Sequence, residues 1–331
     1  MKKKIHGVIE NLEESLRQYD SETTATIGFD GFIDYIVRVV KSKKSKHENV
    51  FFKGINEFGA YISEKSGKSC SIEIIGQMTK TGGNMPIMAT ALGRLGTRVN
   101  CIGALGLPDI RREFAGMRAD GCALYSIAEP GITTALEFDD GKVMLADMTA
   151  LDKISWEGIK SAIGEGVLSE LYEKSTLIGL VNWSEIENST EIWEGVLYEI
   201  LPCLKHRPGR ILFFDLADCS KRQGKDIEKV LHLIEKFSAY GRVVLGMNEN
   251  ESRLAYYALT GNSGNESLER VGSGIYKKLN IDTLVIHPVD GSFAWNKDGD
   301  HYACNFHIRR PKLSTGGGDN FNAGFCWAML M

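Results

Sequence analysis

Three consecutive glycines near the end of the sequence, Gly316, Gly317 and Gly318, restrict what this part of the chain can form. They leave a run of backbone N–H groups that no side chain shields. The apolar residues after them recur at helical spacing: Phe321, Phe325, Ala328 and Met329. A glycine loop that leads into a helix N-terminus favours anions, because free amides and the helix dipole both attract negative charge.

Asp319 stands at the end of this glycine loop. A carboxylate at that place would repel a phosphate, unless it serves as a general base beside a phosphoryl group. The loop therefore predicts a phosphoryl-transfer site. The alternative is a glycine-rich turn that only caps an ordinary helix.

The composition excludes several classes of protein. The 331 residues are 43% hydrophobic and 25% charged, which is typical of a globular protein in water. The net charge of −4 and the pI of about 6.0 argue against nucleic acid or an anionic membrane surface as a partner. No segment is long and apolar enough to span a membrane, and no strand-linked G-x-G-x-x-G motif indicates a dinucleotide-dependent oxidoreductase. Seven scattered cysteines without a C-x-x-C pair indicate free thiols, and we expect a cytoplasmic protein.

The alternation of short β-branched runs with longer amphipathic runs predicts an α/β fold. The expected strands are 24–29, 98–104, 175–182, 210–216, 242–248 and 282–287. The expected helices lie near 84–95, 109–119, 190–204, 222–239, 250–259 and 266–280, and an amphipathic helix over residues 4–18 forms an N-terminal extension, residues 1–20. This alternation predicts a central, mostly parallel sheet with helices on both faces.

Residues 132–148 do not follow this alternation. Two β-branched runs flank Asp139-Asp140-Gly141, which predicts a hairpin with an Asp-Gly turn. A hairpin inside an α/β pattern indicates a small β lid, and we expect a second contribution to it from residues near 33–55.

Two carboxylates, Asp30 and Asp34, follow the first expected strand. Open α/β sheets bind ligands at the carboxyl ends of their strands. Ionised carboxylates accept hydrogen bonds, so the pair suits a polyol. The alternative is a pair of loop acids that cap a turn.

The glycine loop and its helix resemble the second signature of the ribokinase-like carbohydrate kinases, the phosphofructokinase-B type family. That signature reads Asp-Thr-x-Gly-Ala-Gly-Asp; here Ser314, Gly316, Gly318 and Asp319 fall on it, and Gly317 replaces the alanine. The resemblance implies that Asp319 takes the proton of the acceptor hydroxyl, that the amides from Gly316 to Asp319 hold the developing charge, and that Ser314 binds the nucleotide. The leading aspartate is replaced by Leu313, which has no side-chain oxygen and argues against the family's monovalent-cation site.

Residues 81–96 resemble the first signature of the same family, in which Gly-Gly-Asn opens a helix that ends in Arg-Leu-Gly. The resemblance implies that Gly82, Gly83 and Asn84 bind the sugar, with Asn84 both capping the helix and presenting its amide to a hydroxyl. The alternative is that Asn84 is only a cap. The family carries a second asparagine where this sequence has Ile87, which favours a substrate somewhat different from ribose.

Further residues match those with which the family binds the phosphate acceptor and the phosphate donor. The family's sugar-binding aspartate after the first strand is matched best by Asp34, and Asp30 shares the candidacy because Asp34 is one residue further from the strand than is usual. Asn248 and Glu251 resemble the Asn-x-x-Glu element, which places Asn248 at the nucleotide and implies that Glu251 holds Mg²⁺ through water; acids at the start of an ordinary helix are the alternative. Gly291 matches a nucleotide loop that is compressed here.

Together the motifs cover residues 24–331 and imply one ribokinase-like domain over residues 1–331, with a β lid. The implied activity is transfer of the γ-phosphoryl group of ATP to a sugar hydroxyl, with Mg²⁺ as cofactor and a homodimer through the lid as a further option. The alternatives are a regulatory protein that binds nucleotide or sugar without turnover, a nucleoside or ADP-dependent sugar kinase, and an unrelated α/β enzyme with another phosphate ligand. Family members continue through helices that wall the adenine site, whereas this sequence ends at Met331; either the protein continues or its nucleotide site is completed otherwise.

Overall fold

The computed structural model describes residues 23–207, 209–263, 265–305 and 316–331. The N-terminal helix expected for residues 4–18, and Ser314 in the glycine loop, lie outside these ranges. Within the described ranges, no helix combines the length and the apolar character that a membrane span requires.

Nine strands form the main sheet. They are β1 (Thr24–Phe29), β5 (Arg98–Gly103), β6 (Cys122–Ser126), β9 (Leu177–Leu180), β10 (Ile211–Asp215), β11 (Arg242–Met247), β12 (Thr283–Ile286), β13 (Gly291–Asn296) and β14 (Gly299–Cys304). Their order is β14-β13-β12-β11-β10-β9-β1-β5-β6. All neighbours from β12 to β6 pair in parallel, and β13 and β14 add an antiparallel hairpin at one edge. The six expected strands are confirmed, whereas β6, β13 and β14 were not predicted.

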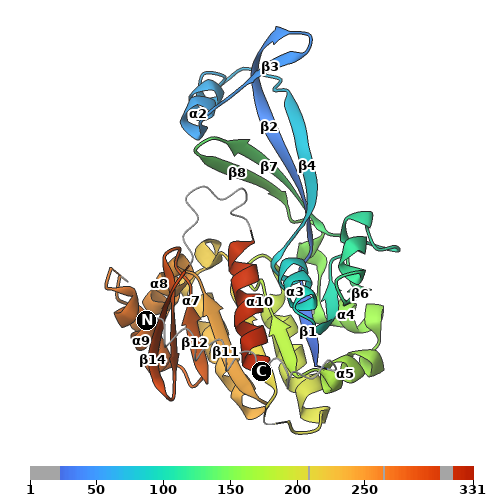
Figure 1. Ribbon diagram of the computed structural model, residues 1–331, viewed down its shortest axis with the longest axis vertical. Helices are drawn as coiled ribbons and strands as arrows, with labels where there is room; N and C mark the ends of the chain where they lie inside the picture. The colour runs from blue at the N-terminus through green and yellow to red at the C-terminus, as the bar shows by residue number, and fades with distance from the viewer. Residues whose placement is uncertain (1–22, 208, 264, 306–315) are drawn as a thin grey trace, which may run out of the picture.

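Helices cover both faces of this sheet (Figure 1). One face carries α3 (Asn84–Arg94) and α10 (Gly317–Leu330), which pack against each other and onto apolar residues of β1, β5 and β10. The other face carries α4 (Trp156–Ile163), α5 (Glu165–Lys174), α6 (Ser189–Gly195), α7 (Gly224–Lys236), α8 (Glu249–Thr260) and α9 (Leu268–Lys278). The α/β fold with helices on both faces is therefore confirmed.

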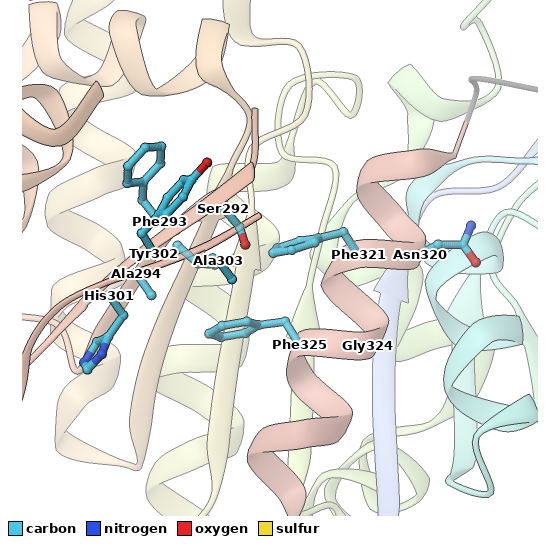
Figure 2. A pocket seen from close by; sticks show the side chains of 11 residues that line it. Ser292, Phe293, Ala294, His301, Tyr302, Ala303, Asn320, Phe321, Gly324 and Phe325 are labelled. Atoms are coloured by element: carbon cyan, nitrogen blue, oxygen red, sulfur yellow. The ribbon is translucent and has the colours of Figure 1, made fainter. Parts of the chain in front are cut away.

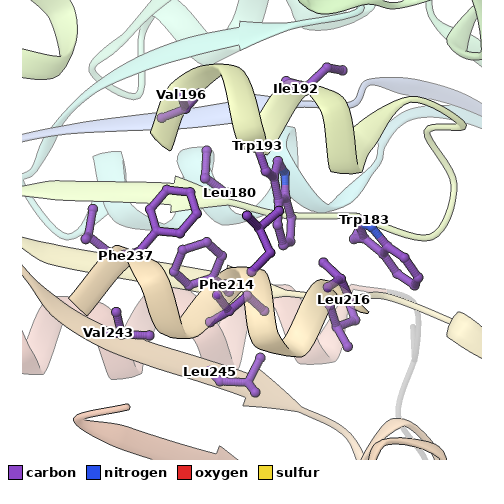
Figure 3. Packing of buried hydrophobic residues seen from close by; sticks show 14 of the residues in the cluster. Leu180, Trp183, Ile192, Trp193, Val196, Phe214, Leu216, Phe237, Val243 and Leu245 are labelled. Atoms are coloured by element: carbon purple, nitrogen blue, oxygen red, sulfur yellow. The ribbon is translucent and has the colours of Figure 1, made fainter. Parts of the chain in front are cut away.

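The core on the α4–α9 face is rich in aromatic side chains. The ring of Phe214 from β10 lies 5.3 Å from the ring of Trp193 and 4.9 Å from that of Phe237, both edge-on (Figure 3). Such pairs add about 0.5–1.5 kcal/mol each beyond the burial of their surface. This packing fixes the strands whose carboxyl ends carry the candidate site.

Two expected helices differ from the prediction. Residues Arg112–Arg118 form a 3₁₀ helix in place of an α-helix, because Gly116 weakens the helix and the buried Phe114 and Met117 are three residues apart. The helix expected for 190–204 is α-helical only to Gly195, then continues as a π turn (Val196–Ile200) and a 3₁₀ turn (Leu201–Cys203). Pro202 lacks the N–H that an α-helix would need there.

A second, five-stranded sheet projects from the main body (Figure 1). It consists of β2 (Phe32–Ser45), β3 (Glu48–Phe51), β4 (Ile74–Gly82), β7 (Gly131–Phe138) and β8 (Gly141–Asp147), and α2 (Ile55–Ser63) packs on it. The expected lid segments near 33–55 and 132–148 both lie in this sheet. β4 was not predicted, because its residues are mostly exposed and show no alternation of apolar and polar side chains.

Candidate active site

Polar side chains gather where four parallel strands end. Asp30 follows β1, Asn182 follows β9, Asp215 ends β10 and Asn248 follows β11. The N-termini of α3 and α10 reach the same edge, which is the ligand-binding edge of open α/β sheets (Figure 1). The sequence-predicted residues Asp30, Asn84, Asn248 and Asp319 therefore meet at one place.

Asp30 is fully buried and binds the start of α3. Its carboxylate accepts hydrogen bonds from the backbone N–H of Asn84 (2.7 Å) and of Met85 (2.8 Å), and from the side-chain amide of Asn182 (2.7 Å). Burial raises the pKa of Asp30 to about 7, against these hydrogen bonds. Both carboxylate oxygens are thus engaged by the protein, and Asp30 fixes the loop at Gly83 and Asn84.

Asp34 lies on a different element, within β2 and beside Gly82. Its Oδ2 is 3.7 Å from Nζ of Lys80 on β4, and Thr133 on β7 is a hydrogen-bond partner. A Cβ at Gly82 would lie 2.5 Å from Oδ1 of Asp34, so a side chain at this position would displace the carboxylate. Burial raises the pKa of Asp34, although Lys80 opposes the shift. The second sheet therefore carries a buried carboxylate to the start of α3.

Asn84 is the first residue of α3, and its side chain does not cap the helix. The N-cap is Gly83, with a φ of 95°, and Asp30 accepts the N–H groups that a cap would take. The expected cap is wrong because a buried carboxylate already fills that place. The Nδ2 of Asn84 instead donates to Oδ1 of Asp215 at 3.2 Å.

The glycine loop leads into α10 as expected. Gly316 is the N-cap in the left-handed region (φ 84°) and packs against Ile87 of α3, whose Cδ1 would lie 3.1 Å from an added Cβ. At Gly317 an added Cβ would meet nothing within 4 Å, so this part of the loop is open. Burial, followed by the charges of Asp215 and Asp30, raises the pKa of Asp319 well above its usual value.

Asn248 and Glu251 bind one another at the start of α8. The Oδ1 of Asn248 accepts from the N–H of Glu251 (2.9 Å), and Oε2 of Glu251 accepts from the N–H of Asn248 (2.9 Å), which is a capping box. Glu251 is buried, and burial together with the charge of Asp215 raises its pKa. In the described part of the chain, no three His, Cys, Asp or Glu side chains are grouped as a direct metal cage.

An apolar cavity lies beside this edge, between α10 and the β13–β14 hairpin. Its volume is about 450 Å³, and Figure 2 shows Phe321 and Phe325 projecting from α10 toward the hairpin, while Asn320 points away. Gly291 is the first residue of β13 and not part of a loop, because it pairs with Cys304 of β14. Tyr302 of β14 occupies the space that a side chain at residue 291 would need. The neighbouring Ser292 lines the cavity.

Three residues of the site were not singled out from the sequence. Asp215 accepts hydrogen bonds from Asn84 and from Asn322 of α10, and Asn182 links Asp30 to Glu185. Asp215 and Asn182 lie at the ends of two expected strands, so the rule that selected Asp30 could have found them. Asn322 gave no such signal, because it lies inside a helix.

The model of one protein family, described as prokaryotic ketohexokinase, matches residues 2–331. The ketohexokinase of Haloferax volcanii is 28% identical over 330 residues, which cover 97% of this chain and 85% of that protein.

Solved structures share the fold at low identity. A ribokinase of Thermotoga maritima has a TM-score of 0.61 at 15% identity, covering 93% of this chain and 86% of its own. The adenosine kinase of Sinorhizobium meliloti has a TM-score of 0.64 at 14% identity (94% and 88%). A ribokinase II of E. coli, solved with ATP and Mg²⁺, has a TM-score of 0.60 at 12% identity (92% and 85%). These likenesses confirm the ribokinase-like fold, as the two signatures implied.

Proposed function

Because the chain belongs to the prokaryotic ketohexokinase family and is accordingly a sugar kinase, we propose that it transfers the γ-phosphoryl group of ATP to a hydroxyl of a ketohexose. One observation supports this most: the glycine loop with Asp319 and the Gly-Gly-Asn start of α3 meet at one edge of the sheet, joined through Asp215. The proposed phosphate cradle and the proposed polyol site would thus be adjacent, as phosphoryl transfer requires.

In the proposed reaction Asp319 accepts the proton of the attacking hydroxyl. A carboxylate with a raised pKa is a stronger base than an exposed one, and burial supplies that shift here. The backbone amides from Gly316 to Asp319 would hold the charge that develops on the transferred phosphoryl oxygens. The open space at Gly317 leaves room for a phosphate against these amides.

The proposed acceptor site uses Asp34, Gly82, Gly83 and Asn84. Asp34 would accept hydrogen bonds from sugar hydroxyls, since Lys80 lies at 3.7 Å and leaves part of the carboxylate's capacity free. Asp30 would support these residues by accepting hydrogen bonds from the backbone N–H groups of Asn84 and Met85. The ketohexose itself is proposed from the name of the Haloferax volcanii relative.

The proposed donor site lies toward β12 and β13. The apolar cavity beside Phe321 and Phe325 would take the adenine ring, and Asn248 would face the phosphates. The rings of His287 and Phe321 pack at a tilt of 39° with their centroids 4.8 Å apart, and burial lowers the pKa of His287 to about 4, so it is neutral there. We therefore assign it no charge-based role toward ATP.

The residues present fit a hydrated Mg²⁺. Glu251 and Asp215 are buried acids whose negative charges repel one another, so a nearby cation would relieve this repulsion. Mg²⁺ keeps several waters and needs few protein ligands, so Glu251 could hold it through water without a direct cage. When bound, Mg²⁺ would neutralise charge on the ATP phosphates.

A substrate screen tests the proposal. Ketohexoses, aldohexoses and nucleosides are each incubated with the protein, ATP and Mg²⁺, and ADP release is measured. We expect the highest kcat/KM for a ketohexose. Turnover of a nucleoside alone would contradict the proposed acceptor, and binding of sugar and ATP without turnover would indicate a regulatory protein.

A further inference from the structure

Asp215 joins the two helices that carry the proposed chemistry. Its carboxylate accepts from Nδ2 of Asn84 on α3 (3.2 Å), from Nδ2 of Asn322 on α10 (2.7 Å), and from the N–H of Ala217 in its own loop (2.7 Å). Only 5% of Asp215 is exposed. One buried carboxylate at the end of a rigid central strand thus holds both helix starts.

The position of the Asn322 side chain shows that its hydrogen bond to Asp215 is specific. Asn322 is 1% exposed, and its Oδ1 has no hydrogen-bond partner among the described residues. That oxygen lies over Gly246 of β11, where an added Cβ would come within 3.1 Å of it. The amide group of Asn322 is therefore held through its Nδ2 by Asp215. Asn322 is three residues after Asp319, so its anchor fixes the helical turn that carries the proposed base.

We propose that Asp215 is a positioning residue that sets α3 and α10 relative to one another, and so places Asp319 at the acceptor hydroxyl. This inference rests on the proposed function. Asp215 acts through Asn84 and Asn322 and needs no contact with the substrate. A displacement of about 1 Å at a reacting group can cost about 100-fold in rate, so such an anchor is sufficient to control kcat.

Asp215 also acts on Asp319 through its charge. The described acids around Asp319 are Asp30 after β1, Asp215 on β10, Glu185 after β9 and Glu251 on α8. From β12 the neighbour is His287, which is neutral. Of the acids, Asp215 contributes most to the raised pKa of Asp319. Loss of the charge of Asp215 should therefore lower the pKa of Asp319. In a plot of kcat against pH, the acidic limb should then move to lower pH.

The first test compares Asp215→Asn with the wild type on the best ketohexose. We expect kcat to fall by about 10- to 100-fold while the KM values for sugar and ATP change by less than about 3-fold. Asn322→Ala removes the anchor of α10 and leaves the carboxylate of Asp215 in place, so it should lower kcat at alkaline pH, where Asp215 is ionised. The double variant should lose little more than Asp215→Asn alone, because both act through one link. Asp109→Asn, an exposed acid in a loop, is the matched control and should leave kcat unchanged.

Two results would overturn the inference. One is a wild-type kcat in Asp215→Asn. The other is a loss of kcat that follows a proportional loss of thermal stability, with the pH profile unmoved, because that assigns Asp215 to stability alone.

A second readout needs no turnover. The side-chain amide signals of Asn84 and Asn322 in ¹⁵N spectra, identified by their loss in the two Asn→Ala variants, should both shift in Asp215→Asn. If the wild type phosphorylated no sugar but both signals shifted, the proposed function would fail and the link between the helices would stand. If neither signal moved, the inference would fail whatever the activity.

Discussion

Asp319 combines a proposed catalytic role with a cost in stability. Burial raises its pKa in the folded protein above the unfolded value of about 3.9, so the ionised form is less stable folded than unfolded. The cost is absent below the unfolded pKa and grows as pH rises through the folded pKa. We expect Asp319→Asn to be more stable than the wild type at high pH, with the difference shrinking toward pH 4. Urea unfolding between pH 4 and pH 9 measures this, and a difference that is independent of pH would contradict it.

Asp34 gives a separate test of the acceptor site. Loss of a hydrogen bond to a charged group costs about 1.5–3 kcal/mol, which corresponds to about 10- to 100-fold in affinity. We expect Asp34→Ala to raise the KM for the sugar by that factor and to leave the Kd for ATP nearly unchanged. Asp139→Ala, which changes an exposed acid in the β7–β8 turn, is the control. Calorimetry that showed equal sugar affinity in Asp34→Ala and the wild type would remove Asp34 from the site.

Glu251, at the start of α8, tests the proposed metal requirement. We expect activity to be lost in excess chelator and restored by Mg²⁺. Glu251→Gln can still accept the N–H of Asn248, so it should fold, but it lacks the charge that orders a hydrated cation. The Mg²⁺ concentration for half-maximal rate should therefore rise in this variant. Full activity of the wild type in chelator would exclude the metal role.

At the scale of elements, the cavity between α10 and the β13–β14 hairpin allows the proposed donor site to be tested separately from the acceptor site. Phe325 lies in the second turn after Asp319 and faces the apolar cavity (Figure 2). Truncation to Ala removes part of the surface on which an adenine ring would lie. We expect Phe325→Ala to raise the KM for ATP several-fold and the KM for the sugar much less. An unchanged KM for ATP would place the adenine ring elsewhere.

The strands and helices that could be predicted best are those for which a local pattern of apolar residues is sufficient. The apolar strands at 211–215 and 283–286 are buried along their whole length, and their patterns were sufficient. β4 was missed because most of its residues are exposed, so its place in the sheet depends on pairing with β2. Pairing between segments far apart in the sequence leaves no local signal.

In the candidate site, too, local motifs could be predicted and long-range contacts could not. The glycines and Asp319 could be found because loop and helix follow one another in the chain. The hydrogen bonds of Asp30 and of Asp215 could not, since their partners are 54 and 107 residues away. The cap assigned to Asn84 was wrong for this reason: a carboxylate from another strand took the place that helix rules give to a local side chain.

At the scale of the whole molecule, two sheets meet at the proposed reaction centre. The main sheet brings Asp30, Asp215 and Asn248 to one edge, and the second sheet brings Asp34 to the start of α3. Closure of the second sheet over bound sugar would exclude water from the transferred phosphoryl group. In the proposed mechanism, kinase activity needs both sheets, and Asp319 is the residue on which we expect it to depend most.

The most direct measurement is kcat with the best ketohexose, ATP and Mg²⁺ for the wild type and for Asp319→Asn. The substitution keeps the size and shape of the side chain and removes the base. We expect kcat to fall by at least about 100-fold, the low end of what a general base contributes. ATP affinity should be retained or increased, because a negative charge near the phosphates is gone. Equal and measurable rates in the two proteins would contradict the account.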